Sequence, residues 1–107
     1  MPQNNESYKT LTKNGGPFEL RDRKSKFLGY AFPVSDREAA EARIAALWET
    51  HQDASHVCYA FRIGRVQPEI RAQDDGEPTH AAGAPILAQI QGYELFDVLV
   101  AVVRYYG

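Results

Sequence analysis

The run Val98-Leu99-Val100-Ala101-Val102-Val103 limits the possible folds more than any other stretch of the chain. Successive side chains of a β-strand point to opposite faces, so a strand built from this run is apolar on both faces. Strands of that kind lie in the middle of a sheet, with other layers covering them. We therefore expect a strand over Asp97–Tyr106 that is buried in mid-sheet and around which the rest of the chain packs.

Four other segments have the alternation or the flanking turn residues of strands. In the segment Phe27–Val34, the larger apolar face is formed by Leu28, Tyr30, Phe32 and Val34. We expect this face to point toward the core. Residues 1–16 are polar and end in two glycines, which predicts a flexible lead-in with a short extended piece at Tyr8–Thr12. The predicted strands are Phe18–Leu20, Phe27–Val34, His56–Gly64 and a short one at Glu69–Gln73.

The firmest helix prediction begins at Ser35-Asp36-Arg37-Glu38, which has the pattern of a capping box with Ser35 as the cap. The helix is expected to run to about Thr50. Its apolar residues recur at helical spacing and form one stripe, so Trp48 is expected to be largely buried. The residues of this stripe are Ala40, Ile44, Leu47 and Trp48.

A second helix is predicted over Ala81–Ile90, with Pro85 tolerated near its first turn and Gly92 ending it. The element order β-β-α-β-β-α-β indicates an α+β fold. We predict a two-layer sandwich, in which a mixed sheet carries the helices on one face.

Two helices on one face leave the other face of Val98–Val103 without cover. We therefore expect the natural chain to continue beyond Gly107 and to supply another layer. The present form should then expose apolar surface near its last strand, which favours self-association.

Composition limits the class of protein. The chain has 107 residues, of which 44% are hydrophobic and 24% charged, with a net charge of −2. These values are typical of one soluble globular domain, assigned here to residues 17–107, and they give no support for bulk attraction to nucleic acid or membrane. The first residues lack a signal-peptide apolar segment, so a cytoplasmic location is expected. Cys58 is the single cysteine, which excludes an internal disulfide; no cofactor or metal site is predicted.

The segment Gln73–Leu87 concentrates the residues with chemical potential. Asp74, Asp75 and Glu77 surround Gly76, which can adopt a positive φ in a tight turn. Three readings stay open: a solvated turn that caps N–H groups, a cation site, or a partner for arginines. Because adjacent carboxylates repel one another, we expect the group to cluster with at least one arginine. The candidates are Arg62, Arg71 and, as first choice, Arg104.

Two further features carry weaker signals. His56 is expected to be a hydrogen-bonded strand histidine, and a nucleophilic pair with Cys58 lacks an evident orienting acid or oxyanion donor. A basic cluster precedes the second strand and forms either a solvated hairpin or a contact for phosphate groups of nucleic acid. This cluster consists of Arg21, Arg23, Lys24 and Lys26.

Five short motifs follow one another along the chain. They are Lys24-Ser25-Lys26-Phe27, Ala54-Ser55-His56-x-Cys58-Tyr59-Ala60, Asp74-Asp75-Gly76-Glu77-Pro78, Ala82-Gly83-x-Pro85-Ile86-Leu87 and Arg104-Tyr105-Tyr106-Gly107. Together, in this order, they resemble the N-terminal domain of the YigZ/IMPACT family. The resemblance covers the chain from about Phe18 to its end and implies the α+β fold of the ribosomal protein S five domain two-like group. It also implies that the C-terminal part of the domain is lacking here.

The resemblance implies a non-enzymatic binding module that acts in translation or its regulation, through a protein partner or through the ribosome or RNA. One alternative is a small divalent-cation-dependent hydrolase or nucleotide-handling enzyme that uses Asp74-Asp75-Gly76-Glu77. Another is a nucleic-acid binder that uses the basic cluster. The candidate binding surface comprises His56, Asp74, Asp75, Gly76, Glu77 and Arg104.

Overall fold

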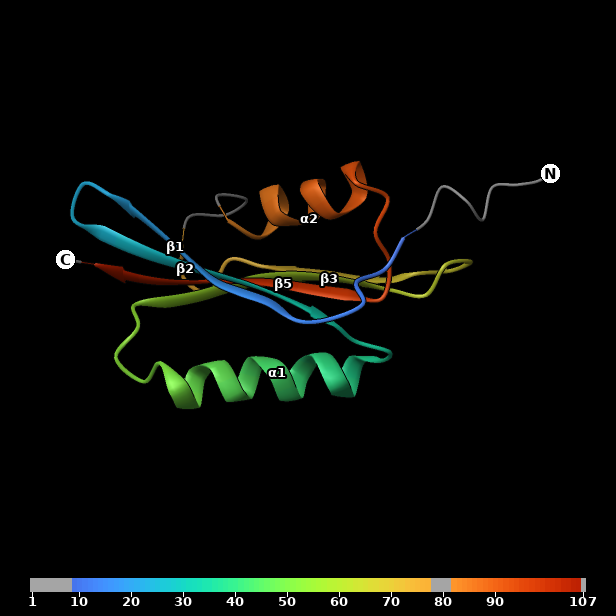
Figure 1. Ribbon diagram of the computed structural model, residues 1–107, viewed down its shortest axis with the longest axis horizontal. Coiled ribbons are helices and arrows are strands. Elements are labelled where there is room, and N and C mark those ends of the chain that lie inside the picture. The colour runs from blue at the N-terminus through green and yellow to red at the C-terminus, as the bar shows by residue number, and fades with distance from the viewer. Residues whose placement is uncertain (1–8, 78–81, 107) are drawn as a thin grey trace.

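The computed structural model describes residues 9–77 and 82–106, which form one five-stranded sheet and two helices (Figure 1). The α+β fold class is confirmed. No helix in this described part is long and apolar enough to cross a membrane. In chain order the elements are β1 Gly15–Asp22, β2 Ser25–Pro33, α1 Arg37–Thr50, β3 His56–Ile63, β4 Glu69–Gln73, α2 Gly83–Gly92 and β5 Val98–Tyr106.

The strand β5 lies at the centre of the sheet, as its sequence predicts. The strand order is β1-β2-β5-β3-β4, and every neighbouring pair is antiparallel, so the expectation of a mixed sheet was wrong. Residue Ala101 pairs with Tyr30 of β2 on one side and with Tyr59 of β3 on the other. Both hydrogen-bonding edges of β5 are therefore occupied along most of its length.

The two helices lie on opposite faces of the sheet, with α1 below and α2 above it in Figure 1. The expectation of a two-layer sandwich with both helices on one face was therefore wrong, and the fold has three layers. Side chains that alternate along β5 explain the difference: Leu99, Ala101 and Val103 pack on the α1 face, whereas Val98 and Val100 pack with α2. Each helix covers one of the two apolar faces that the sequence of β5 creates.

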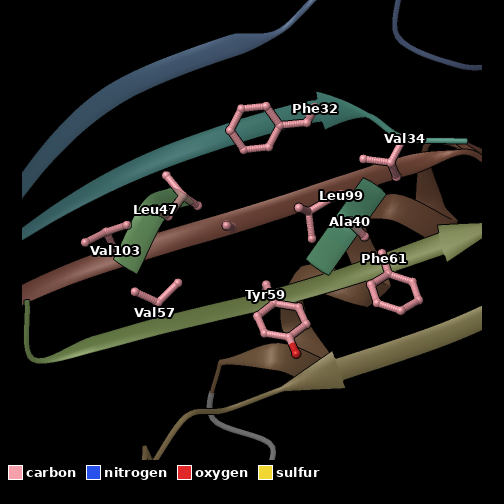
Figure 2. Close-up of a cluster of buried hydrophobic side chains, with 10 residues drawn as sticks. Phe32, Val34, Ala40, Leu47, Val57, Tyr59, Phe61, Leu99 and Val103 are labelled. Carbon is pink, nitrogen blue, oxygen red and sulfur yellow. The ribbon is translucent and has the colours of Figure 1, made fainter. Parts of the chain in front are cut away.

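The larger core lies between α1 and the sheet, where ten buried side chains form one cluster (Figure 2). The face of β2 that carries Phe32 contributes to it, as expected. Phe61 and Leu99 are fully buried in this layer and face α1. The labelled residues are Phe32, Val34, Ala40, Leu47, Val57, Tyr59, Phe61, Leu99 and Val103.

Helix α1 differs from its prediction in two details. Asp36, rather than Ser35, is the N-cap: its Oδ1 accepts a hydrogen bond of 2.8 Å from the Ala39 N–H. Aspartate is as effective a cap as serine, and a start one residue later moves Glu38 out of the capping-box position. Trp48 is 36% exposed and lies outside the core. It lies about 80° around the helix axis from Ala40, at the margin of the buried stripe.

The smaller core lies beneath α2, where Ile90 packs on Ala60 and Val98. Helix α2 contacts β3, β4 and β5, and among the described residues it makes no comparable contact with β1 or β2. Phe18 and Leu20 of β1 are accordingly 70% and 64% exposed. Apolar surface therefore remains uncovered on the β1–β2 side of this face.

The segment before β1 contacts the α2 side of the molecule. Lys9 forms an isolated parallel bridge with Leu95, and Leu11 packs against the smaller core. The predicted extended piece thus pairs in part, although Tyr8 lies outside the described residues. Strand β1 begins at Gly15, inside the range expected to be a lead-in.

His51 ties the C-terminal end of α1 to two strands. Its Nε2 lies 2.8 Å from the Tyr30 hydroxyl and its Nδ1 lies 2.6 Å from the Tyr105 hydroxyl. A neutral imidazole can donate one of these bonds and accept the other. Burial lowers the pKa of His51, and the nearby Lys26 ammonium lowers this pKa further. The neutral ring is therefore the form that fits the folded protein.

Substitution in α1 should separate the core stripe from its margin. Leu47→Ala is expected to lower the free energy of unfolding by about 2–4 kcal/mol, because it opens a cavity in a packed core. Trp48→Ala should cost clearly less, since this ring is already partly in water. Urea denaturation followed by circular dichroism measures both changes. A larger loss at Trp48 than at Leu47 would contradict this packing.

The His51 cluster should make stability depend on pH. Since the folded pKa lies below the ordinary value of about 6.5, the unfolded chain binds more protons as the pH falls through 6.5. Stability should therefore be highest above pH 6.5 and fall below it. Urea denaturation between pH 5 and 8 should show a steeper fall for the wild type than for His51→Phe. Parallel curves would mean that His51 is not the titrating group.

Candidate functional site

The acidic turn lies between β4 and α2 and folds against the start of β3. Glu77 N–H donates a 3.1 Å hydrogen bond to the Asp74 carbonyl and closes the turn. Asp75 and Gly76 both have positive φ, 51° and 84°. A Cβ on Gly76 would lie 3.4 Å from the His56 ring, so both conformation and space favour glycine here.

Asp74 fixes the turn to the beginning of α2. Its Oδ1 accepts hydrogen bonds from the N–H groups of Ala82, at 3.1 Å, and Gly83, at 2.7 Å. These are free N–H groups of the first helical turn, where a carboxylate is favoured by hydrogen bonding and by the helix dipole. A Cβ on Gly83 would lie 2.5 Å from the Gln73 nitrogen, so only glycine allows the helix to approach β4 so closely.

Asp75 fixes the same turn to β3. Its Oδ2 accepts a 2.7 Å hydrogen bond from Val57 N–H, and its carbonyl oxygen lies 2.6 Å from His56 Nδ1. A carbonyl can only accept, so Nδ1 carries the proton and donates. The expectation of a hydrogen-bonded strand histidine is met. The ring also lies edge-on to Tyr106, with a centroid separation of 5.7 Å.

Glu77 forms an ion pair with Arg104 that is largely shielded from water. Arg104 Nη1 donates to both carboxylate oxygens, at 2.8 and 3.1 Å, and the two side chains are 11% and 26% exposed. Arg104 Nη2 also donates to Ser25 Oγ at 3.3 Å. The guanidinium lies over the ring of Tyr106, 4.3 Å from the centroid. The expected choice of Arg104 as the arginine partner is therefore observed, for Glu77.

The other two candidate arginines serve elsewhere. Arg62 donates to the Leu95 carbonyl at 3.3 Å, and Arg71 lies over the Phe61 ring. The negative charges of the three carboxylates are thus compensated in two ways. Asp74 and Asp75 accept hydrogen bonds from backbone N–H groups, and Glu77 pairs with Arg104. The turn-capping and arginine-pairing readings of the sequence both apply, to different residues.

This arrangement limits what the site can do chemically. Among the described residues, no group of three or more His, Cys, Asp or Glu side chains is placed to hold a metal ion. Burial raises the pKa of Cys58 to about 12, and the carboxylates of Glu77, Asp75 and Asp74 contribute to that rise. The thiol is therefore protonated, and it donates to the Asp74 carbonyl at 3.1 Å. A protonated, buried thiol is a poor nucleophile.

A cavity of about 430 Å³ lies beside the turn, between the start of α2 and the sheet. Its walls are mainly apolar, and Glu77 and Arg104 bring a carboxylate and a guanidinium to it. Analysis of the sequence missed Phe27, Ile86 and Val102. The available signal was the second face of β2, where Phe27 stands beside the small residues Gly29 and Ala31, and the second apolar face of β5, which carries Val102. The lining residues are Phe27, Cys58, Glu77, Ala82, Ile86, Val102 and Arg104.

The basic cluster does not join this site. Arg23 and Lys24 form the exposed turn between β1 and β2, and Arg21 pairs with Glu19 at 2.7 Å. Lys26 lies opposite Tyr105, with its ammonium 4.8 Å from that ring. Since Phe27 lies opposite Arg104, Lys26 faces the α1 side of the sheet, away from the cavity.

Loss of the shielded ion pair should cost more stability than loss of an exposed one. Glu77→Gln is expected to lower the free energy of unfolding by about 2–3 kcal/mol, because Arg104 keeps a charge without its counter-ion. The control is Glu41→Gln, which removes an exposed pair with Arg37 and should cost about 0.5 kcal/mol or less. Urea denaturation at pH 7 measures both. Equal losses would show that water already screens the Glu77–Arg104 pair.

Comparison with known proteins identifies the family. The sequence model of the Impact N-terminal domain matches residues 23–107. An "IMPACT family member" of Haemophilus influenzae is 36% identical over 99 residues, which are 91% of this chain and 48% of that protein.

Two solved structures agree with this result. One, described as a crystal structure of a hypothetical protein, has a TM-score of 0.86 and 33% identity, covering 90% of this chain and 47% of that one. The other is the two-domain translational regulator Yih1, with a TM-score of 0.71, 29% identity and coverage of 91% and 39%. The chain spans less than half the length of each of these relatives. The family match and the shared fold together establish that this chain belongs to the IMPACT family and carries its N-terminal domain.

Proposed function

We propose that this chain is a non-enzymatic binding module that acts in translation or its regulation by binding a protein partner. Membership of the IMPACT family supports the process, since the structurally similar Yih1 is described as a translational regulator. We place this activity in the cytoplasm, where translation takes place. The mode of binding rests on the geometry of the chain itself.

The observation that carries the proposal is the cavity beside the acidic turn. Its volume of about 430 Å³ falls in the range of ligand-binding pockets, which are mainly apolar with a few placed polar groups. Phe27, Ile86 and Val102 supply apolar surface, and the Glu77–Arg104 pair supplies hydrogen-bonding groups at the wall. Such a site fits an apolar side chain of a partner protein whose neighbouring backbone can bond to the ion pair.

The acidic turn acts as the scaffold of this site. Asp74 and Asp75 hold α2 and β3 in place through backbone N–H groups, which keeps Glu77 over the end of β5. A binding site gains affinity when its walls are ordered before the partner arrives. In this proposal His56, Asp74, Asp75 and Gly76 therefore support the surface, while Glu77 and Arg104 contact the partner.

The hydrolase alternative receives less support from the same geometry. A divalent cation needs several convergent oxygen ligands. Here the carboxylate oxygens of Asp74, Asp75 and Glu77 accept hydrogen bonds from three different parts of the fold. To bind a cation, the turn would have to give up the contacts that position it.

A photo-cross-linking experiment tests the proposal. A benzophenone amino acid is placed at Phe27, in the cavity wall, or at Val66, which is 93% exposed on the β3–β4 connection, as the matched control. Each protein is irradiated in a ribosome-containing cell extract, with and without nuclease. We expect the Phe27 position to capture a protein of the translation machinery or one of its regulators, and the Val66 position not to capture it.

Three outcomes would contradict the proposal. The same products at both positions would indicate non-specific contact. A nuclease-sensitive product at Phe27 would indicate RNA as the partner instead of protein. The third outcome concerns Ile86→Ser, a change in the cavity wall whose folding is checked by circular dichroism. If the Phe27 position captures the same product in this variant, the cavity is not part of the binding surface.

A further inference from the structure

We propose that β1 is a docking edge for a second copy of this chain, with the two β1 strands pairing antiparallel about a two-fold axis at Leu20. The proposal does not depend on the partner or function proposed above. Four observations on β1 carry it: an open edge, a short regular segment, complementary charges on one face and exposed apolar side chains on the other.

Strand β1 is an outer strand of the sheet, and β2 is the only element with which it makes extensive contact among the described residues. In Figure 1 the β1–β2 hairpin extends beyond the ends of both helices, so neither helix covers this edge there. An uncovered edge presents free N–H and C=O groups that can pair with another strand. The register with β2 shifts between Gly15 and Phe18, and Pro17 has no N–H. The part of β1 that can pair with a further strand is therefore residues 18–22.

The backbone groups that point away from β2 can be identified from the hairpin. Asp22 and Ser25 flank a two-residue turn, and such flanking residues form a hydrogen-bonded pair. The pairs then alternate along the ladder, so Leu20 bonds to Phe27, whereas Glu19 and Arg21 direct their N–H and C=O groups outward. A second strand must consequently pair through Glu19 and Arg21.

Several registers would pair through Glu19 and Arg21, and the charges of these two side chains favour one of them. An axis at Leu20 places Glu19 of each copy opposite Arg21 of the other, and both pairs then exchange backbone hydrogen bonds. An axis at Glu19 or at Arg21 would place like charges directly opposite, which is unfavourable. The two side chains already share one face of the sheet, since Arg21 Nε lies 2.7 Å from Glu19 Oε2. They are therefore positioned to form reciprocal pairs across the axis.

The same register relieves a conflict inside the monomer. Arg21 lies directly opposite Lys26 on β2, so two cations are neighbours on the α1 face. In the dimer, Glu19 of the second copy lies on the other side of Arg21 and compensates this charge. The charge arrangement of the hairpin is thus more favourable in the pair than in one copy.

On the opposite face, the register brings exposed apolar side chains together. Leu20 of one copy meets Leu20 of the other as a non-hydrogen-bonded pair, the closer of the two pair types. Phe18 lies diagonally across from Leu20 of the second copy, within reach of a large ring. These two side chains are 70% and 64% exposed in the monomer. Because the paired segment is short, we expect a reversible dimer that depends on concentration.

Charge reversal tests the register. Sedimentation velocity over a wide concentration range should show dimer for the wild type. Glu19→Arg and Arg21→Glu should each weaken dimerisation by about tenfold or more, because each places like charges opposite one another. An equimolar mixture of the two variants restores both opposite-charge pairs and should form a heterodimer. The double variant should dimerise like the wild type.

Disulfide trapping provides a second measurement. In the proposed register the two Leu20 Cα atoms are roughly 4.5 Å apart, which a disulfide can span, whereas the two Phe18 Cα atoms are about 14 Å apart. In a Cys58→Ser background, oxidised glutathione should cross-link Leu20→Cys between copies and leave Phe18→Cys largely monomeric. Circular dichroism confirms that each variant folds.

Several results would overturn the proposal. A monomeric wild type at the highest concentration would do so, as would single charge variants that dimerise as well as the wild type. Failure of the mixed variants to associate would exclude the register. More efficient cross-linking at Phe18→Cys than at Leu20→Cys would indicate a different contact between copies.

Discussion

Strand β5 is buried on both faces, and this double burial fixes where the other elements can pack. Leu99, Ala101 and Val103 need cover on one side of the sheet, and Val98 and Val100 need it on the other. A single helix layer cannot satisfy both requirements, so α1 and α2 take opposite faces. The outer strands then pack at increasing distance from β5, and β1 is left with the least cover.

The acidic turn follows from this layering because α2 must start close to the edge of the sheet. Gly83 allows the helix to approach the backbone of Gln73, and Asp74 satisfies the first free N–H groups of the helix. Asp75 and Glu77 then bind the turn to β3 and β5. Three carboxylates that the sequence crowds together thereby become structural ties to three different elements, which leaves the cavity wall with an ordered ion pair.

The two surfaces proposed for binding, both built from described residues, differ in chemistry. The cavity beside α2 combines apolar walls with the Glu77–Arg104 pair and fits an inserted side chain. The β1 edge offers backbone groups, alternating charges and exposed apolar side chains, and fits another strand. The cavity lies between the start of α2 and the sheet, whereas β1 lies beyond the strands that α2 contacts. The position of α2 over β3, β4 and β5 thus forms the first surface and leaves the apolar side chains of the second exposed.

Patterns in the sequence were enough to predict the elements of this protein, the central position of β5, the core face of β2 and the pairing of the acidic turn with Arg104. These follow from local periodicity, turn residues and charge, which act over a few residues or between strong opposite charges. Packing in three dimensions placed the helices on opposite faces, left Trp48 at the margin of its stripe and made Asp36 the cap of α1. Tertiary structure also created the cavity, because Phe27, Ile86 and Val102 come from three different elements, β2, α2 and β5. Contacts between such elements depend on how the helices and the sheet pack against each other. A pattern within one short segment does not predict that packing.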